Sequence, residues 1–170
     1  MSDQHSSSPL GRYDDSPSDD PLHEVRLVGV PVRVLVAGRQ HHDELMHEFS
    51  VLAVAEDSRA DVPQRMLDLI ETLGTRYASS AERPDAEVDA AQARGDDTVD
   101  LAYQVSAHVV EAADRLAALM AEADDFCRRE QMLTLERTEV MRTFAEWYLD
   151  EFRRQVNGEP PRPWDGPLDV

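Results

Sequence analysis

The stretch TVDLAYQV, residues 98–105, decides how this chain folds. Its apolar and polar side chains alternate, and because successive side chains of a strand point to opposite faces, the pattern predicts a half-buried β-strand. Ser106 is a suitable N-cap for a helix that would run to about Arg129 with one apolar face. The apolar positions are Val99, Leu101, Tyr103 and Val105 on the strand and Val109, Ala113, Leu116, Met120, Ala123 and Cys127 on the helix.

The other elements follow from similar patterns. The β-branched stretch VRLVGVPVRVLV, residues 25–36, predicts a strand in which Gly29 and Pro31 imply a kink or a division into two short strands. MLTL, residues 132–135, predicts a short buried strand. Thr138 is a suitable N-cap for the last helix. Helices are expected over about 39–55, 62–78 and 139–156, with a short exposed helix at about 85–94.

The order of these elements predicts the fold class. Residues 99–156 would form a β-α-β-α unit, whose crossover should be right-handed if its strands are parallel. Amphipathic helices bury their apolar faces most simply as a second layer on a sheet. We therefore predict an α/β or α+β fold, a two-layer sandwich in which roughly four or five amphipathic helices cover a small mixed sheet of about three to four strands.

Composition divides the chain into a leader, one domain and a tail. Residues 1–22 are rich in Ser, Pro and Asp. Such a segment cannot offset its ordering entropy by burial, so we expect a disordered acidic leader. Residues 24–157 carry the periodic patterns, and a chain of 170 residues has the size of one globular domain. Residues 158–170 form a Pro-rich C-terminal tail.

The tail has two interpretations. Partner proteins recognise Pro-rich segments in their extended form, which makes Trp164, Pro161 and Arg162 candidate partner-binding residues. Alternatively, Trp164 packs on its own domain and pins the tail there. We expect the second of these, because a large aromatic ring gains more from burial on its own domain than from exposure to solvent.

Charge and composition exclude several classes of partner. The chain has 35 acidic and 17 basic residues and a formal net charge of −18, so its surface repels nucleic acid and anionic membranes. All 17 basic residues are Arg, which excludes lysine chemistry. The single cysteine, Cys127, lies in a helical apolar stripe, which predicts a core residue. Because signal-peptide and membrane-spanning patterns are missing, we expect a cytoplasmic protein whose partners are other proteins.

Common catalytic motifs are missing from the sequence. It contains no Gly-x-Gly, Gly-x-Ser-x-Gly or His-Glu-x-x-His pattern, which favours a non-enzymatic protein without a cofactor. The alternative is an unrecognised acid/base site among Asp100, Asp124 and Glu151, whose carboxylates would have to meet across a cleft. Asp124, however, precedes Arg128 by four residues, which predicts an exposed helical ion pair.

The segment GRQHHDELMHEF, residues 38–49, holds three of the six histidines. On a helix, Glu44 and His47 have the spacing that carboxylate-bridged metal sites use in helical bundles, but such sites need a second motif on a facing helix, and the chain has none. The other interpretation is the solvated face of a helix, with His42 half-buried beside the apolar stripe. The candidate metal ligands are His41, Glu44, His47 and Glu48.

Several segments together resemble a family of uncharacterised actinobacterial proteins. These segments are VPVRV (30–34), HHDELMHEFSVLA (41–53), TVDLAYQV (98–105), ADDFC (123–127), MLTL (132–135) and EWYLDEFRRQVNGEPPRPW (146–164). That family is associated with the gene neighbourhoods of partner-switching regulators, the anti-sigma-factor kinases and their STAS-domain antagonists. The resemblance implies a signalling accessory protein in a stress-response circuit. The chain lacks the ATPase motifs of the kinase itself.

Two functional predictions follow. The first is a non-enzymatic regulatory protein that acts by protein–protein interaction, as the missing motifs and the resemblance imply. The second is a small-ligand or metal sensor that uses the helix containing residues 41–48.

Overall fold

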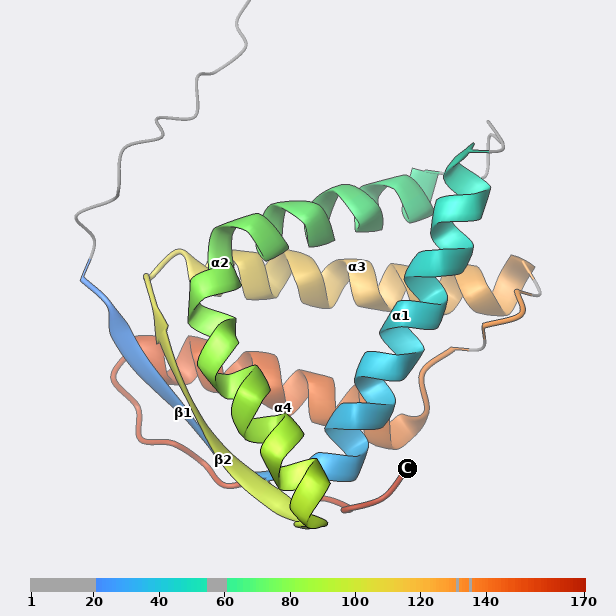
Figure 1. Cartoon of the computed structure of the whole chain (residues 1–170). Helices are drawn as coiled ribbons and strands as arrows, with labels where there is room; N and C mark the ends of the chain where they lie inside the picture. The colour runs from blue at the N-terminus through green and yellow to red at the C-terminus, as the bar shows by residue number, and fades with distance from the viewer. Residues whose placement is uncertain (1–20, 55–60, 131, 135) are drawn as a thin grey trace, which may run out of the picture.

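Four helices and a two-stranded sheet make up the part of the chain that the computed structural model describes, which is residues 21–54, 61–130, 132–134 and 136–170. The general α+β class is confirmed (Figure 1). All but the last two residues of the predicted leader lie outside the described residues. In chain order the elements are β1 (His23–Pro31), α1 (Val32–Val54), α2 (Asp61–Arg94), β2 (Thr98–Val105), α3 (Val109–Glu130) and α4 (Glu139–Val156).

The sheet is an antiparallel ribbon of β1 and β2, in which Leu27 lies opposite Leu101. The register shifts between Leu27 and Val30, where Gly29 has a φ of 71°. A positive φ is unfavourable for residues with a side-chain Cβ, so glycine suits this irregularity. The amide of Gly29 donates to the Asp100 carboxylate at 2.8 Å. The kink that Gly29 predicted is therefore a local shift of register within one strand.

Two clusters of buried side chains hold the helices to each other and to the ribbon. The ribbon core lies where α4 packs on β1 and the second half of α2 packs on β2, and the helical core lies where α1, α2 and α3 meet. The ribbon core contains Val25, Leu27, Val30, Val34, Val88, Leu101, Tyr103, Val105, Val109, Phe144, Trp147 and Phe152. The helical core contains Leu45, Phe49, Met66, Leu119, Ala123, Phe126 and Cys127.

The prediction of three to four strands is wrong, since the described residues form a sheet of two. Part of the difference lies in residues 32–36, which were expected to continue the first strand and instead begin α1. Pro31 ends β1, the amide of Val32 donates to the carbonyl of Asp97, and Val34 is completely buried from the first turn of the helix. Burial in the ribbon core outweighs the strand preference of these β-branched residues, which amounts to about 1 kcal/mol or less.

The strand predicted at residues 132–135 is also absent from its described residues, 132–134. The amides of Leu133 and Thr134 donate to the Glu48 carboxylate of α1, at 3.0 and 2.9 Å, and not to another strand. The Leu133 side chain is 94% exposed, so it is not the buried position that the apolar pattern predicted. The expected β-α-β-α unit over 99–156 is therefore a β-α-α arrangement.

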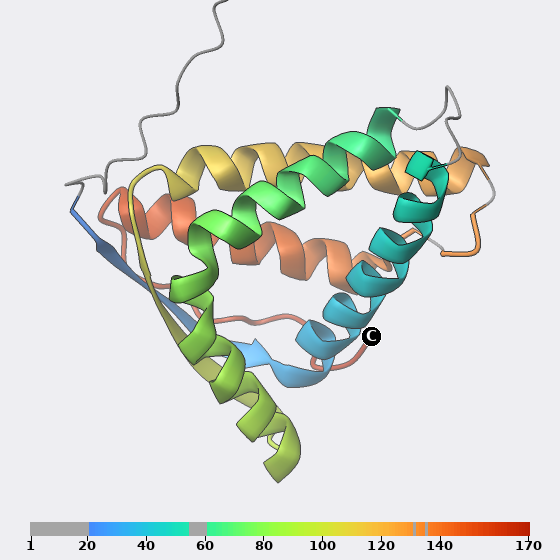
Figure 2. The same cartoon turned by 45° about the horizontal axis from the view of Figure 1, so that its top comes forward.

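Helix boundaries agree with the sequence to different degrees. The helices expected at 62–78 and 85–94 form one bent helix, α2, with Pro84 inside it (Figures 1 and 2). A proline within a helix removes a backbone hydrogen bond and kinks the helix. The chain therefore bends without ending the helix, and one bent helix stands where two separate helices were expected. The predicted bounds of α4 are confirmed, and the Thr138 hydroxyl accepts from the amide of Met141 as its N-cap. No helix in the described part of the chain is long and apolar enough to cross a membrane.

Candidate functional site

All four helices line a cleft of about 620 Å³. In Figure 1, α1 and α2 lie in front, and α3 and α4 pass behind them. The apolar lining of the cleft consists of Val34, Leu35, Gly38, Leu45, Met46, Met66, Ile70, Leu116, Met120, Ala123, Met141, Phe144, Ala145, Tyr148 and Leu149. Its polar lining consists of Arg39, His41, His42, Asp43, Asp85, Asp89, Asp124 and Arg137.

The two ends of α3 pack in different cores, and the cleft lies beside the middle of this helix. Val109 and Ala113 belong to the buried residues at the ribbon end, and Ala123 and Cys127 belong to the helical core. Leu116 lies between these two ends and lines the cleft. The helices are thus held together at two ends, while the middle of the predicted stripe lines a space large enough for a small molecule.

Methionine is over-represented in the cleft wall. Four of the six methionines in the chain line it, from all four helices: Met46, Met66, Met120 and Met141. Their unbranched side chains rotate freely and carry a polarisable sulfur, so a methionine-rich wall adapts to apolar molecules of different shape. The rings of Phe144 and Tyr148 from α4 complete the apolar surface.

The rim of the cleft is charged and joins α1 to α2. The guanidinium of Arg39 on α1 lies 2.5 Å from the carboxylate of Asp85 on α2 and 4.0 Å from that of Asp89. These side chains are substantially exposed, and the exposed Asp43, four residues after Arg39 on α1, also lines the cleft. The rim pair therefore links α1 to α2 at the edge of the cleft.

Deeper in the cleft lies an ion pair that is mostly buried. The guanidinium of Arg137 donates to both oxygens of Asp124, with the shortest contact 2.7 Å, and the Arg137 amide donates to the same carboxylate at 3.1 Å. The two side chains are 13% and 9% exposed. The prediction that Asp124 pairs with Arg128 is therefore wrong, because Arg128 instead contacts Asp125 and Glu136.

Two imidazoles, those of His41 and His42 on α1, also line the cleft. Burial lowers the pKa of His41, although the nearby Asp124 carboxylate opposes the shift. Burial also lowers the pKa of His42. Neither ring has a hydrogen-bond partner among the described residues. Both are therefore neutral near pH 7, and each offers one donor and one acceptor to a molecule in the cleft.

The candidate metal ligands point to different places. His41 lines the cleft, whereas the Glu48 carboxylate accepts from the amides of residues 133 and 134. Burial by itself would raise the pKa of Glu48, but these hydrogen bonds lower it overall. Glu44 and His47 are exposed, as expected for the solvated face of a helix. That interpretation holds for these two residues and not for His41 and Glu48, which are partly buried. Among the described residues, no three His, Cys, Asp or Glu side chains are placed to hold a metal ion together.

The three carboxylates considered for acid/base chemistry each contact a different part of the chain and do not meet in one site. Asp100 accepts from the amide of Gly29, Asp124 pairs with Arg137, and Glu151 binds the C-terminal tail. Only Asp124 lines the cleft. The structure thus assigns each of them to a separate structural contact.

Cys127 is a core residue, as its position in the apolar stripe predicted. Its side chain is buried in the helical core. Burial raises the pKa of the thiol to about 11, and the carboxylates of Asp124 and Glu48 contribute further to the increase. The group therefore stays protonated at neutral pH and is a poor nucleophile.

The C-terminal tail packs on its own domain. The amide of Trp164 donates to the carbonyl of Val28 in β1 at 3.0 Å, and its ring contacts those of Phe144 and Trp147, with centroids 5.5 and 5.4 Å apart. Trp147 donates from Nε1 to the carbonyl of Arg162 at 3.1 Å. Of the two interpretations of Trp164, the structure shows the one in which this residue pins the tail. Pro161 and half of the Arg162 side chain stay exposed.

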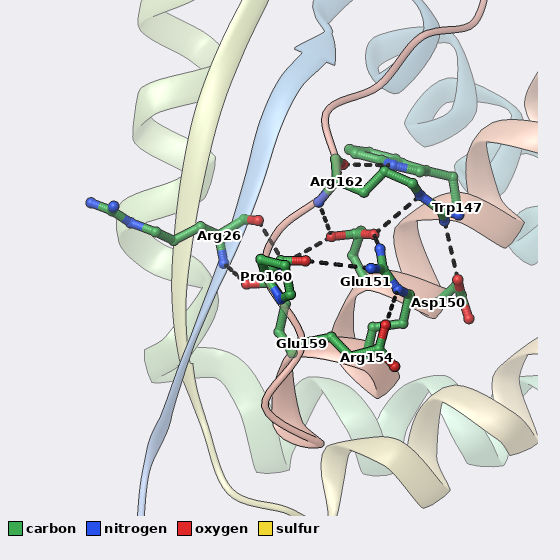
Figure 3. Close-up of polar contacts among 9 residues, drawn as sticks. Arg26, Trp147, Asp150, Glu151, Arg154, Glu159, Pro160 and Arg162 are labelled. Atoms are coloured by element: carbon green, nitrogen blue, oxygen red, sulfur yellow. Dashed lines mark hydrogen bonds and ion pairs between the residues drawn. The ribbon is translucent and has the colours of Figure 1, made fainter.

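Glu151 is the centre of the tail contact, a role that was not predicted (Figure 3). Its side chain is completely buried and accepts from the Arg154 guanidinium at 2.7 Å, the Gln155 amide at 3.0 Å and the Arg162 backbone amide at 2.9 Å. A signal for it was present, because Glu151 follows Trp147 by four residues and so occupies the buried stripe of α4. An acid in such a stripe requires partners.

Comparison with known proteins yields no relatives. No profile of a known protein family matches the chain. No curated protein and no solved structure matches it either. The function is therefore inferred from the chain's own residues.

We expect Glu151→Gln to lower the free energy of unfolding by about 2 kcal/mol, because glutamine carries an NH2 group in place of one of the two buried oxygens that accept from Arg154, Gln155 and Arg162. Urea denaturation measures this change. Trp147 and Trp164 are the only tryptophans and contact each other, so their fluorescence reports whether the tail is docked. Glu146→Gln, exposed on the same helix, is the control and should change stability by less than about 0.5 kcal/mol. Equal midpoints for both variants would contradict the role of Glu151.

The two cleft imidazoles predict a pH dependence of stability. Their pKa values are lowered by folding, so below about pH 6.5 the unfolded chain binds more protons than the folded chain, and stability falls as the pH falls. The double variant His41→Gln/His42→Gln should lose less stability between pH 7 and about pH 5.5 than the wild type, as measured by thermal unfolding. His47→Gln, exposed on the same helix, should keep the wild-type slope. Identical slopes for all three proteins would refute the prediction.

Proposed function

We propose that this protein is a non-enzymatic regulatory sensor that binds a small apolar molecule in the cleft between its four helices. The observation that carries the proposal is the cleft itself, about 620 Å³ with methionine, aliphatic and aromatic walls. The cleft opens to solvent, so its apolar walls expose surface that a bound molecule would cover. Its volume lies within the range of small-molecule sites in proteins.

The residues of the cleft support binding more than catalysis. Among the residues that the structure describes, those lining the cleft include no serine, threonine, cysteine or lysine, which are common nucleophiles in enzymes. The most buried acid, Asp124, is held by Arg137 through several hydrogen bonds and is not free to accept a proton from a substrate. What remains available is apolar surface, two neutral imidazoles and the exposed carboxylates of the rim, which can recognise a molecule by contact and hydrogen bonding.

Filling the cleft should abolish ligand binding. Ala145 lines the cleft from α4, and Ala145→Phe would place a ring in the space. We expect the uncharged dye N-phenyl-1-naphthylamine to bind the wild type, with increased fluorescence, and to bind the variant at least about tenfold more weakly, a change of 1.4 kcal/mol. Ala118→Phe on the exposed side of α3 is the control and should bind as the wild type does. No dye binding, or equal binding to both variants, would contradict the proposal.

The second candidate function is contact with another protein, and the resemblance implies a sigma-factor partner-switching circuit as its setting. The observation that favours it is the tail, which is anchored through Trp164 and the backbone of Arg162 while Pro160, Pro161 and Pro163 stay exposed. An extended proline-rich segment that is already held in place loses little entropy on binding.

The double variant Pro161→Ser/Pro163→Ser tests this second function, because it changes the exposed rings and keeps the anchors of the tail. We expect the wild-type chain to retain a specific protein from an extract of its source cells, and the variant to retain much less of it. Pro21→Ser, exposed at the other end of the described chain, is the control. Failure of the wild type to retain any specific protein would argue against the partner.

A further inference from the structure

We infer that the cleft selects apolar molecules that carry a positive charge, such as lipophilic amines. The inference rests on the proposed ligand-binding function and specifies the chemistry of the ligand. It follows from the charges that line the cleft and from which of them are exposed.

Negative charge exceeds positive charge in the lining. Four aspartates face two arginines, which leaves two negative charges in excess when both imidazoles are neutral. The chain as a whole is negative in the same sense, with a net charge of −18. An anionic ligand would meet repulsion at the cleft and over the whole surface, whereas a cation would be attracted.

Both guanidinium groups are already occupied. Arg137 is bound by Asp124, and Arg39 lies 2.5 Å from Asp85. A carboxylate on a ligand would therefore have to displace one of these pairs to gain a cationic partner. Binding of an anion would cost the energy of an existing ion pair in addition to the repulsion.

Two carboxylates at the rim remain available to a cation. The nearest guanidinium nitrogen to Asp89 is 4.0 Å away, and Asp43 has no ion pair among the described residues. Asp89 is 76% exposed. An ammonium group at the rim could thus stay partly hydrated while it contacts these carboxylates, which keeps its desolvation penalty small.

The order of the groups fits an amphipathic cation with its charge at the rim. The methionine and aromatic walls would receive the apolar body, and the half-buried rings of His41 and His42 line the same cleft as the exposed rim carboxylates. A neutral imidazole has a nitrogen lone pair that accepts a hydrogen bond from an ammonium N–H. The rings of Phe144 and Tyr148 would attract a cation that enters more deeply.

A matched series of ten-carbon probes tests the inference on the full chain. Isothermal titration calorimetry at low ionic strength should give decylamine at least about tenfold tighter binding than decanoate, with decanol between them. Added salt should narrow the difference, because the rim is exposed and its charges are screened. Equal or tighter binding of decanoate would overturn the inference.

Removing one carboxylate charge at the rim tests whether the rim causes the preference for decylamine. Asp89→Asn should weaken decylamine binding by about threefold to tenfold and leave decanol binding unchanged. Asp68→Asn is the matched control, because it removes one negative charge from an exposed position on the same helix outside the cleft. If both variants bind decylamine as the wild type does, the rim carboxylates do not select the ligand, and the inference fails.

The two levels of the proposal fail in different ways. Binding of decanol and the uncharged dye without a preference for decylamine would overturn the charge selection and leave the ligand-binding function in place. If no probe binds to the folded chain, both are wrong.

Discussion

The ion pair between Asp124 and Arg137 fixes the position of α4 relative to α3, and the cleft depends on that position. The Arg137 guanidinium binds both carboxylate oxygens of Asp124, and one of these oxygens also accepts from the Arg137 backbone amide. In addition, the Arg142 guanidinium donates to the Arg137 carbonyl. A buried ion pair adds little net stability compared with apolar packing, but its geometry is specific. Arg137 directly precedes Thr138, the N-cap of α4, so the ion pair holds the start of this helix. The aromatic face of α4 then lies against the cleft and the ribbon.

Local patterns predicted the elements whose own sequence determines them. The strand over 98–105 alternates strictly because one of its faces is buried, and α4 has both a capping residue and a terminating glycine. Residues 32–36 and 132–135 were predicted as strands because β-branched and aliphatic residues favour strands, but such preferences are weak. Their conformation is set by contacts from distant residues, namely the Asp97 carbonyl and the Glu48 carboxylate, which no local pattern contains.

The candidate site was less predictable than the fold. His42 was expected to be half-buried, and Cys127 was expected in the core, because both follow from their positions on one helix. The cleft needs side chains from four helices whose relative positions are tertiary, so its methionines had no recognisable spacing. Arg137 follows Asp124 by thirteen residues and lies beyond the end of α3. Ion pairs on one helix form between residues three or four apart, so this spacing predicted Arg128 as the partner of Asp124.

The cleft and the tail are connected through one ring. Phe144 lines the cleft on one side, and Trp164 of the tail packs edge-on against it with centroids 5.5 Å apart. Packed aromatic rings move together, because cores resist partial displacement. A molecule that pushes against Phe144 would therefore also change the contact that holds the tail, and through Trp164 the hydrogen bond to Val28 of β1. Binding of a small molecule and contact with another protein need not be competing functions, since this arrangement would let the first control the second.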